Sequence, residues 1–136
     1  SVETRLLLDP EADRVPSGPT ILDPQSLVAL QRQANHVAID GSLATYLQAL
    51  ISATRNAPAL ALGASTRGGM NLARAARARA LLHGRSYCIA DDLHDLAVPL
   101  LAHRVRLASY ADGYVPSREE AEAAVRDVVA RVPVPL

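Results

Sequence analysis

Hydrophobic residues recur at helical spacing along most of the chain. Residues 24–35 follow Asp23, a good helix N-cap, and begin with Pro24, which suits the first helical position because its missing N–H needs no partner there. A second apolar series starts at Gly41 and runs through Ile51 with spacings of three and four residues. The pattern predicts one helix that ends near residue 35 and another that stops before Pro58.

The longest helical pattern is rich in alanine. It begins after Ser65 and runs to His83, where Gly84 suits the left-handed conformation that often ends a helix. At 100° per residue the small and apolar residues form one face, which we expect to pack: Leu72, Ala73, Ala76 and Ala80. The opposite face carries Arg67, Asn71, Arg74 and Ala78.

Two further helices follow. Asp91 and Asp92 place negative charge at the positive end of one helix, and Pro99 is expected to interrupt it before a short helical segment at 101–105. Ser117, followed by a glutamate three residues later, forms a capping box that starts the last helix, which runs to about residue 131.

Strand-like sequence is scarce. Two short apolar stretches, Val37–Ile39 and Tyr87–Ile89, could pair with each other. Residues 4–8 end a short helix, and residues 9–18 have the composition of a linker. We therefore predict an all-α helical bundle with at most this minimal two-stranded β pair, divided into a linker at 1–22 and a helical domain at 23–136.

The composition excludes several functions. Fourteen basic residues, all arginine, balance fourteen acidic ones, and there is no Phe or Trp, so a general nucleic-acid binder through Arg67, Arg74, Arg77 and Arg79 is disfavoured. Without lysine no P-loop can be built. One cysteine, no membrane-length apolar run and no signal segment lead us to expect a soluble cytoplasmic protein. A start at Ser1 and a single, internal Met70 suggest an excised piece.

Nothing in the chain resembles a complete catalytic site. The four histidines, at 36, 83, 94 and 103, show no metal-ligand spacing, and Cys88 lies in an apolar stretch that favours simple burial. Ser42, Ser65 and Ser117 all stand at helix starts, where capping accounts for them. We expect no metal and no bound cofactor in this chain alone.

Arg67 is the one candidate site residue. It falls in the first turn of the longest helix, where unpaired N–H groups and the helix dipole favour an anion. From spacing alone, arginines on this helix are more simply solvated or paired with acids, so the pattern marks Arg67 as a phosphate-binding candidate without deciding the question.

Several motifs resemble one family at consistent spacing. Residues 62–69 (LGASTRGG), continuing into 72–78 (LARAARA), are similar to the sensor 2 segment of MoxR-family AAA+ ATPases, in which a Gly-Ala-Ser-Pro-Arg run opens a long alanine-rich helix of the lid. Residues 84–87 (GRSY) with 91–93 (DDL) resemble the family's Gly-Arg-x-Tyr-Val-x-x-x-Asp-Val pattern. Residues 100–104 (LLAHR) resemble its Val-Leu-x-His-Arg motif, and residues 130–135 (ARVPVP) its usual ending.

The sequence departs from the family pattern at three places. Thr66 stands where the family has proline, and Ile89 replaces a capping Thr or Ser. Gly68 and Gly69 are expected to weaken the first turn of the long helix by up to about 1 kcal/mol each relative to alanine. Fraying of these helix starts is therefore expected.

The resemblance, over about residues 23–135, implies a helical lid that follows an ATP-binding core absent from this chain. In such a protein Arg67 would be the sensor 2 residue, contributing to catalysis by contacting ATP, bound with Mg²⁺, in its own subunit or a neighbouring one. The family forms rings, expected to be hexamers, that couple ATP hydrolysis to chaperone-like remodelling, often of von Willebrand factor A domain proteins. The alternative is a free-standing helical protein–protein interaction module without a nucleotide role.

Overall fold

The computed structural model describes residues 4, 8, 18–109 and 114–135. In chain order its elements are α2 (Pro24–Asn35), α3 (Gly41–Asn56), β1 (Leu60–Leu62), α4 (Thr66–Leu82), α5 (Ala90–Leu101), the short 3-10 turn η1 (Ala102–Arg104), β2 (Arg106–Leu107) and α6 (Arg118–Ala130). The predicted all-α class is confirmed. The predicted helix end at 4–8 and the linker at 9–18 lie largely outside the described residues.

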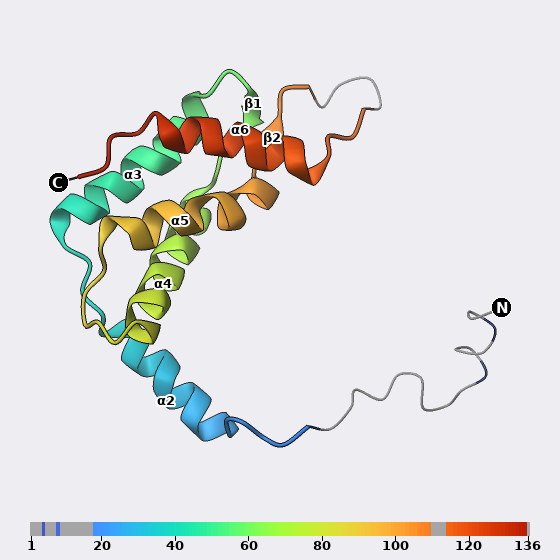
Figure 1. Ribbon diagram of the computed structural model, residues 1–136. Helices are drawn as coiled ribbons and strands as arrows, with labels where there is room; N and C mark the ends of the chain where they lie inside the picture. Colours follow the sequence, from blue (N-terminus) through green and yellow to red (C-terminus); the bar gives the residue numbers. More distant parts are fainter. Residues whose placement is uncertain (1–3, 5–7, 9–17, 110–113, 136) are drawn as a thin grey trace.

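Helices α3 to α6 form a bundle around one core. α4 packs against α5 and α3, and α6 lies across α3 and α5 (Figure 1). Fully buried leucine and valine side chains fill the centre, namely Leu50, Leu72, Leu93, Leu101 and Val125. Alanines at 76, 80 and 97 are also fully buried, and such small side chains allow close packing between α4 and α5.

The predicted faces of the long helix are largely confirmed. Leu72, Ala76 and Ala80 of α4 are buried in the core, whereas Arg67 and Arg74 are exposed. The helix ends as predicted, with His83 as the C-cap and Gly84 at a φ of 72°, a conformation that costs glycine little.

Three predicted capping residues are confirmed, and a fourth, Ser42, is wrong although its helix begins at Gly41 as predicted. The side chains of Asp23, Ser65 and Ser117 each accept a hydrogen bond from the backbone of the first turn. At α3 the N-cap is Asp40, whose carboxylate accepts the N–H of Leu43 at 2.8 Å. Ser42 instead donates its hydroxyl to Asp40 at 2.7 Å, because the aspartate already occupies the capping position.

Pro99 does not interrupt α5, contrary to the prediction. The helix continues through Pro99 to Leu101, and only then tightens into η1. Leu101 is fully buried and Ala102 nearly so, so packing of the last turn against the core offsets the one backbone hydrogen bond that proline removes.

The strand-like stretches pair, but they are not the main β structure. Ala38 forms a single parallel bridge with Tyr87, and its N–H donates to the carbonyl of Ser86 at 2.9 Å. A second, unpredicted pair joins β1 to β2 in antiparallel fashion and buries Leu60 opposite Leu107. These strands of three and two residues are too short to show a periodic pattern in the sequence.

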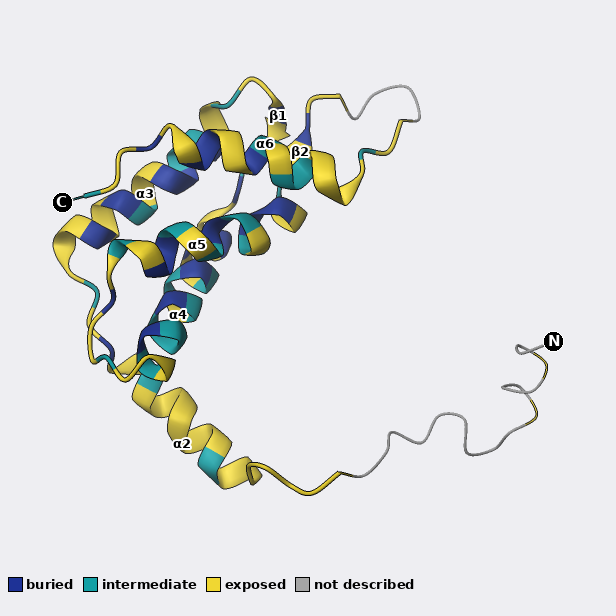
Figure 2. Cartoon of the chain, viewed as in Figure 1, coloured by how far each residue is buried: buried dark blue, intermediate teal, exposed yellow. Residues whose placement is uncertain are grey.

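Helix α2 stands apart from the bundle. It meets the far end of α4, extends away from it and buries no residue (Figures 1 and 2). No helix in the described part of the chain is long and apolar enough to cross a membrane.

Candidate functional site

The loop that leads into α4 is fastened by two side chains from the end of α3. The buried hydroxyl of Thr54 accepts the N–H of Ala64 at 2.9 Å and donates to the carbonyl of Ile51 at 2.7 Å. The guanidinium of Arg55 donates to the carbonyl of Ala64 at 2.9 Å. Both backbone polar groups of Ala64 are thus satisfied by α3, which fixes the direction in which α4 begins.

Gly63 allows this close approach. A Cβ atom at position 63 would lie 2.5 Å from the backbone N and Cα of Arg55, where no real side chain fits. The glycine of the family-like motif therefore has a steric role: it lets the loop touch the backbone of α3.

The first turn of α4 is formed and closely packed. The Ser65 hydroxyl accepts the N–H of Gly68 at 3.3 Å, and Thr66, in place of the family's proline, accepts a hydrogen bond from Arg55 at 3.2 Å. Gly68 and Gly69 are buried, and a Cβ on Gly69 would lie only 3.1 Å from Ile51. The expected fraying is not seen: Gly69 lets the helix start approach Ile51 of α3 closely, and Gly68 lies beside Leu101 and Arg104.

The Arg67 side chain points to solvent. The residue is exposed, and no hydrogen bond or ion pair connects its guanidinium to any residue that the structure describes. It lies in the first turn of a 17-residue helix, where backbone N–H groups lack helical acceptors. This is the arrangement in which a guanidinium is available to an anion from outside the chain.

A shallow hollow beside this helix start is lined by two further arginines. Its walls are Arg55, residues 61–65 and Arg104. The stem of Arg104 lies beside Gly68, with its Cδ 3.7 Å from where a Cβ on that glycine would be. No carboxylate is among the described residues that line the hollow, so its fixed charge is positive.

The other arginines of α4 mostly hold the bundle together. Arg77 donates to the carbonyl of Val37 at 3.1 Å, and Arg79 pairs with Asp95 at 2.6 Å. Arg74 is exposed on the same face as Arg67, two turns further along. The basic side chains of this helix therefore do not form one continuous patch for a polyanion.

Asp92 is a buried charge with a structural role that the sequence did not reveal. Its carboxylate is 1% exposed and accepts two hydrogen bonds from Arg85, at 2.7 and 2.8 Å. It also accepts the N–H of Ile89 at 2.9 Å, which caps α5 in place of the missing Thr or Ser. Burial alone would raise the pKa of Asp92, but the hydrogen bonds from Arg85 and Ile89 and the nearby charges hold it below its ordinary value.

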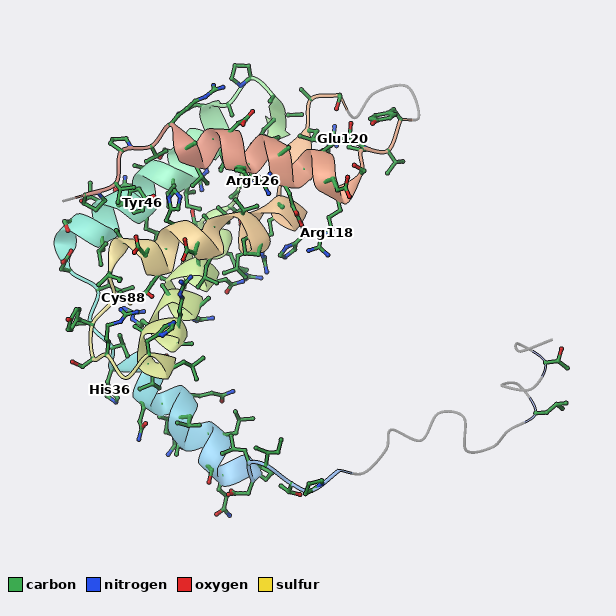
Figure 3. All side chains as sticks on the ribbon, viewed as in Figure 1. His36, Tyr46, Cys88, Arg118, Glu120 and Arg126 are labelled. Carbon is green, nitrogen blue, oxygen red and sulfur yellow. The ribbon has the colours of Figure 1, made fainter. Side chains whose placement is uncertain are left out.

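The histidines and the cysteine do not form a reactive cluster. Tyr46 and Cys88, labelled in Figure 3, are both buried; Tyr46 shares a hydrogen bond of 3.1 Å with His94. Burial raises the pKa of the Cys88 thiol, as expected of a small buried hydrophobe. Among the described residues no group of His, Cys, Asp and Glu could hold a metal ion.

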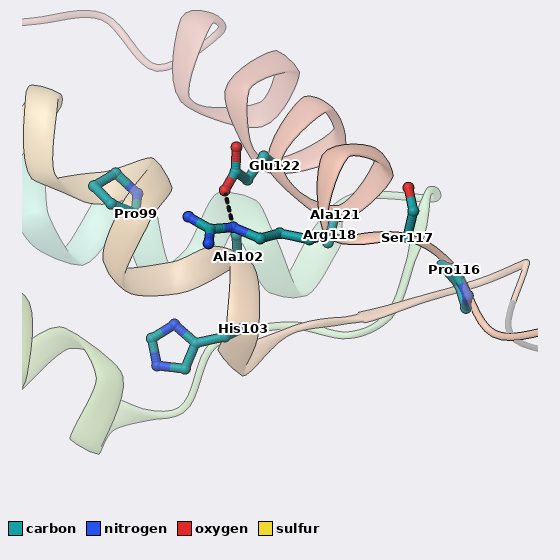
Figure 4. A pocket seen from close by; sticks show the side chains of 8 residues that line it. All are labelled: Pro99, Ala102, His103, Pro116, Ser117, Arg118, Ala121 and Glu122. Atoms are coloured by element: carbon teal, nitrogen blue, oxygen red, sulfur yellow. Dashed lines mark hydrogen bonds and ion pairs between the residues drawn. The ribbon is translucent and has the colours of Figure 1, made fainter. Parts of the chain in front are cut away.

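A hollow between the end of α5 and the start of α6 carries little free charge. Pro99, His103 and Arg118 contribute to its walls, and the Arg118 guanidinium lies 2.6 Å from Glu122 (Figure 4). Because this arginine is already paired, the hollow is a weaker anion candidate than the start of α4.

Comparison with known proteins places this bundle in a family. Residues 52–128 match the AAA lid domain. The chain is 37% identical over 118 residues to the uncharacterized protein YeaC of Bacillus subtilis, which covers 85% of this chain and 35% of YeaC. It is 40% identical over 74 residues to protein MoxR of Paracoccus denitrificans, covering 54% of this chain and 21% of that protein.

Two further similarities agree. The chaperone MoxR1 of Mycobacterium tuberculosis is 32% identical over 101 residues, covering 68% of this chain and 27% of MoxR1. A solved structure of a protein assigned as an ATPase from Cytophaga hutchinsonii superposes with a TM-score of 0.65 at 25% identity, covering 86% of this chain and 45% of that one. This chain thus spans only about a third of YeaC and less of the MoxR proteins. It belongs to the AAA lid domain family, as the lid domain of a MoxR-family AAA+ ATPase.

Proposed function

We propose that this lid closes on ATP held by a separate nucleotide-binding domain, and that Arg67 contacts the terminal phosphate. The state of Arg67 carries the proposal: an exposed guanidinium in the first turn of α4, without a partner in the described part of the chain. The partial positive charge of the helix start and the nearby Arg104 add to the attraction for an anion.

The geometry supports a sensing role as well as binding. A guanidinium donates short, charge-assisted hydrogen bonds to phosphate oxygens, and these exist only while the terminal phosphate is in place. Thr54 and Arg55 hydrogen-bond the start of α4 to α3, so a displacement of Arg67 toward the phosphate is transmitted to the whole bundle. Closure of the lid would then depend on the nucleotide state.

The residues of this chain could bind only the phosphate end of the nucleotide and not its Mg²⁺ ion. Residues 55, 61–65 and 104 around the start of α4 offer positive charge and backbone groups but, among those described, no carboxylate for Mg²⁺. With no lysine in the sequence, a P-loop must come from elsewhere in the protein. ATP with Mg²⁺ would be held chiefly by that domain, and Arg67 would complete the site.

At the level of the whole protein we propose a ring-shaped homo-oligomer, such as a hexamer, that uses ATP hydrolysis to remodel other proteins in the cytoplasm. The name of one similar protein, chaperone MoxR1, supports the remodelling role. We expect client proteins with a von Willebrand factor A domain as partners. We do not expect binding to nucleic acid.

The test is the ATPase rate of the full-length protein with Arg67→Ala. A hydrogen bond to a charged group contributes about 1.5–3 kcal/mol, so we expect turnover to fall by at least about tenfold. Arg74→Ala, which removes an exposed arginine from the same face of α4, is the matched control and should leave turnover near wild type. Both variants should unfold at the wild-type temperature.

Equal turnover in the wild type and Arg67→Ala would refute the sensor role. In that case the alternative, a helical interaction module without a nucleotide role, would be favoured. A P-loop and paired acids elsewhere in the full-length sequence are a further requirement of our proposal, and their absence would also support the alternative.

A further inference from the structure

Helix α2 has an apolar face that nothing in the described structure covers. None of its 12 residues is buried, and its large apolar side chains Leu27, Val28 and Leu30 are 48%, 44% and 40% exposed. Figure 2 shows exposed residues along nearly its whole length, in contrast to α3, α4, α5 and α6.

The exposed residues are arranged for packing. Leu27, Leu30 and Ala34 follow each other at three- and four-residue spacing, which places them on one stripe of the helix. Ala34, near the end that meets α4, is partly covered, and the stripe is open from there toward Asp23. An isolated helix of this length is marginal in water, because most helical stability in proteins comes from packing of an apolar face.

We propose that this stripe docks on the nucleotide-binding domain of the same polypeptide, which makes α2 the element that couples the lid to that domain. The inference rests on the proposed function, in which such a domain holds ATP.

The share of the chain that matches known proteins supports the nucleotide-binding domain as the binding partner of α2. The matches to YeaC and to the solved ATPase cover 85% and 86% of this chain, and a match confined to the residues after Asn35 could not reach that coverage. The α2 region is therefore shared with proteins of which this chain spans only 35% and 45%. More than half of each relative is thus available as a surface for α2.

The size of the stripe favours a domain in the same chain over a second copy of the protein. A stable interface between separate chains buries about 800 Å² on each partner from roughly 20–30 residues a side, which a single 12-residue helix does not offer. A tethered domain needs far less, because the tether gives it an effective concentration on the order of millimolar.

The experiment is hydrogen exchange of backbone amides in the full-length protein. We expect α2 to be protected in the wild type. The double variant Leu27→Ser/Leu30→Ser should speed exchange in α2 by at least about tenfold, because it removes the apolar side chains that the docked helix buries. The same variant should deprotect a surface segment of the nucleotide-binding domain. Val115→Ser, at a valine 72% exposed and distant in sequence, is the control and should change neither.

Three outcomes would overturn the proposal. The first is that the α2 amides of the wild type are not protected. The second is that their protection weakens on twentyfold dilution, because it would then come from another copy. The third is that the double variant loses protection in α2 alone, without any change in the nucleotide-binding domain. The wild-type measurement does not require any variant to fold. Failure of the sensor role would appear separately, as an unchanged ATPase rate in Arg67→Ala with α2 still protected.

Discussion

At Gly63 the chain passes so close to α3 that no side chain can be added. A Cβ there would lie 2.5 Å from the backbone N and Cα of Arg55, so Gly63→Ala must displace backbone. We expect a loss of about 2 kcal/mol or more in the free energy of unfolding, measured by chemical denaturation. Gly41→Ala is the control, because the equivalent Cβ meets nothing within 4 Å and alanine is the better helix former, so stability should hold or rise. Equal losses in both variants would contradict the steric explanation.

The sequence predicts the exposure and capping roles of individual residues better than their packing and burial. The exposure of Arg67 followed from helical periodicity, and the caps at Ser65 and Ser117 from their spacing to the next turn. The packing role of Gly69 was missed, because a helix propensity records only the cost of glycine and not the neighbour that comes within 3.1 Å. Burial of Asp92 was missed for a similar reason, since its partner Arg85 becomes adjacent only when the turn before α5 is folded.

At the scale of elements, the start of α5 depends on the charge of Asp92. The pKa of this carboxyl lies below its ordinary value of 3.8, so the ionised form stabilises the fold above that pH and the contribution is lost as pH falls through the folded pKa. We expect Asp92→Asn to be less stable than wild type by about 2 kcal/mol at pH 7, because it weakens a buried, hydrogen-bonded ion pair.

The difference between wild type and Asp92→Asn should shrink as the pH is lowered below about 4. Thermal unfolding from pH 7 to pH 2.5 measures it. Asp127→Asn, at an exposed aspartate of α6, is the control and should follow the wild-type curve. A constant gap between wild type and Asp92→Asn across this range would show that the ion pair does not account for the effect.

Elements with long periodic patterns were predicted well, and short or tertiary-dependent ones were not. Five helices begin where the helical spacing and the capping signals placed them. β1 and β2 were not predicted because residues 60–62 and 106–107 are too short to show a periodic pattern. They are also far apart in the sequence and become neighbours only when the helical bundle is folded. The prediction at Pro99 was wrong because the helix-breaking tendency of proline is a local property. Burial of Leu101 keeps the helix continuous there.

At the scale of the whole molecule, the lid should move as one body. α3 to α6 share a core whose central leucines and alanines are fully buried, and such close-packed interiors transmit a displacement instead of absorbing it. If Arg67 is drawn toward the terminal phosphate, the fastening at Ala64 carries α3 along with α4. The bundle would then change position without changing its internal packing.

This rigid-body motion makes a prediction for the full-length protein held in two different nucleotide states. Amide exchange in the buried segments of α3, α5 and α6 should be the same, within about twofold, whether a non-hydrolysable ATP analogue or ADP is bound. Changes should be confined to the residues around Arg67 and to α2, where the lid meets the rest of the protein. Arg67→Ala should abolish the nucleotide-dependent difference around α4. Large nucleotide-dependent changes within α5 or α6 would instead show that the bundle deforms, and that its core stores part of the conformational energy.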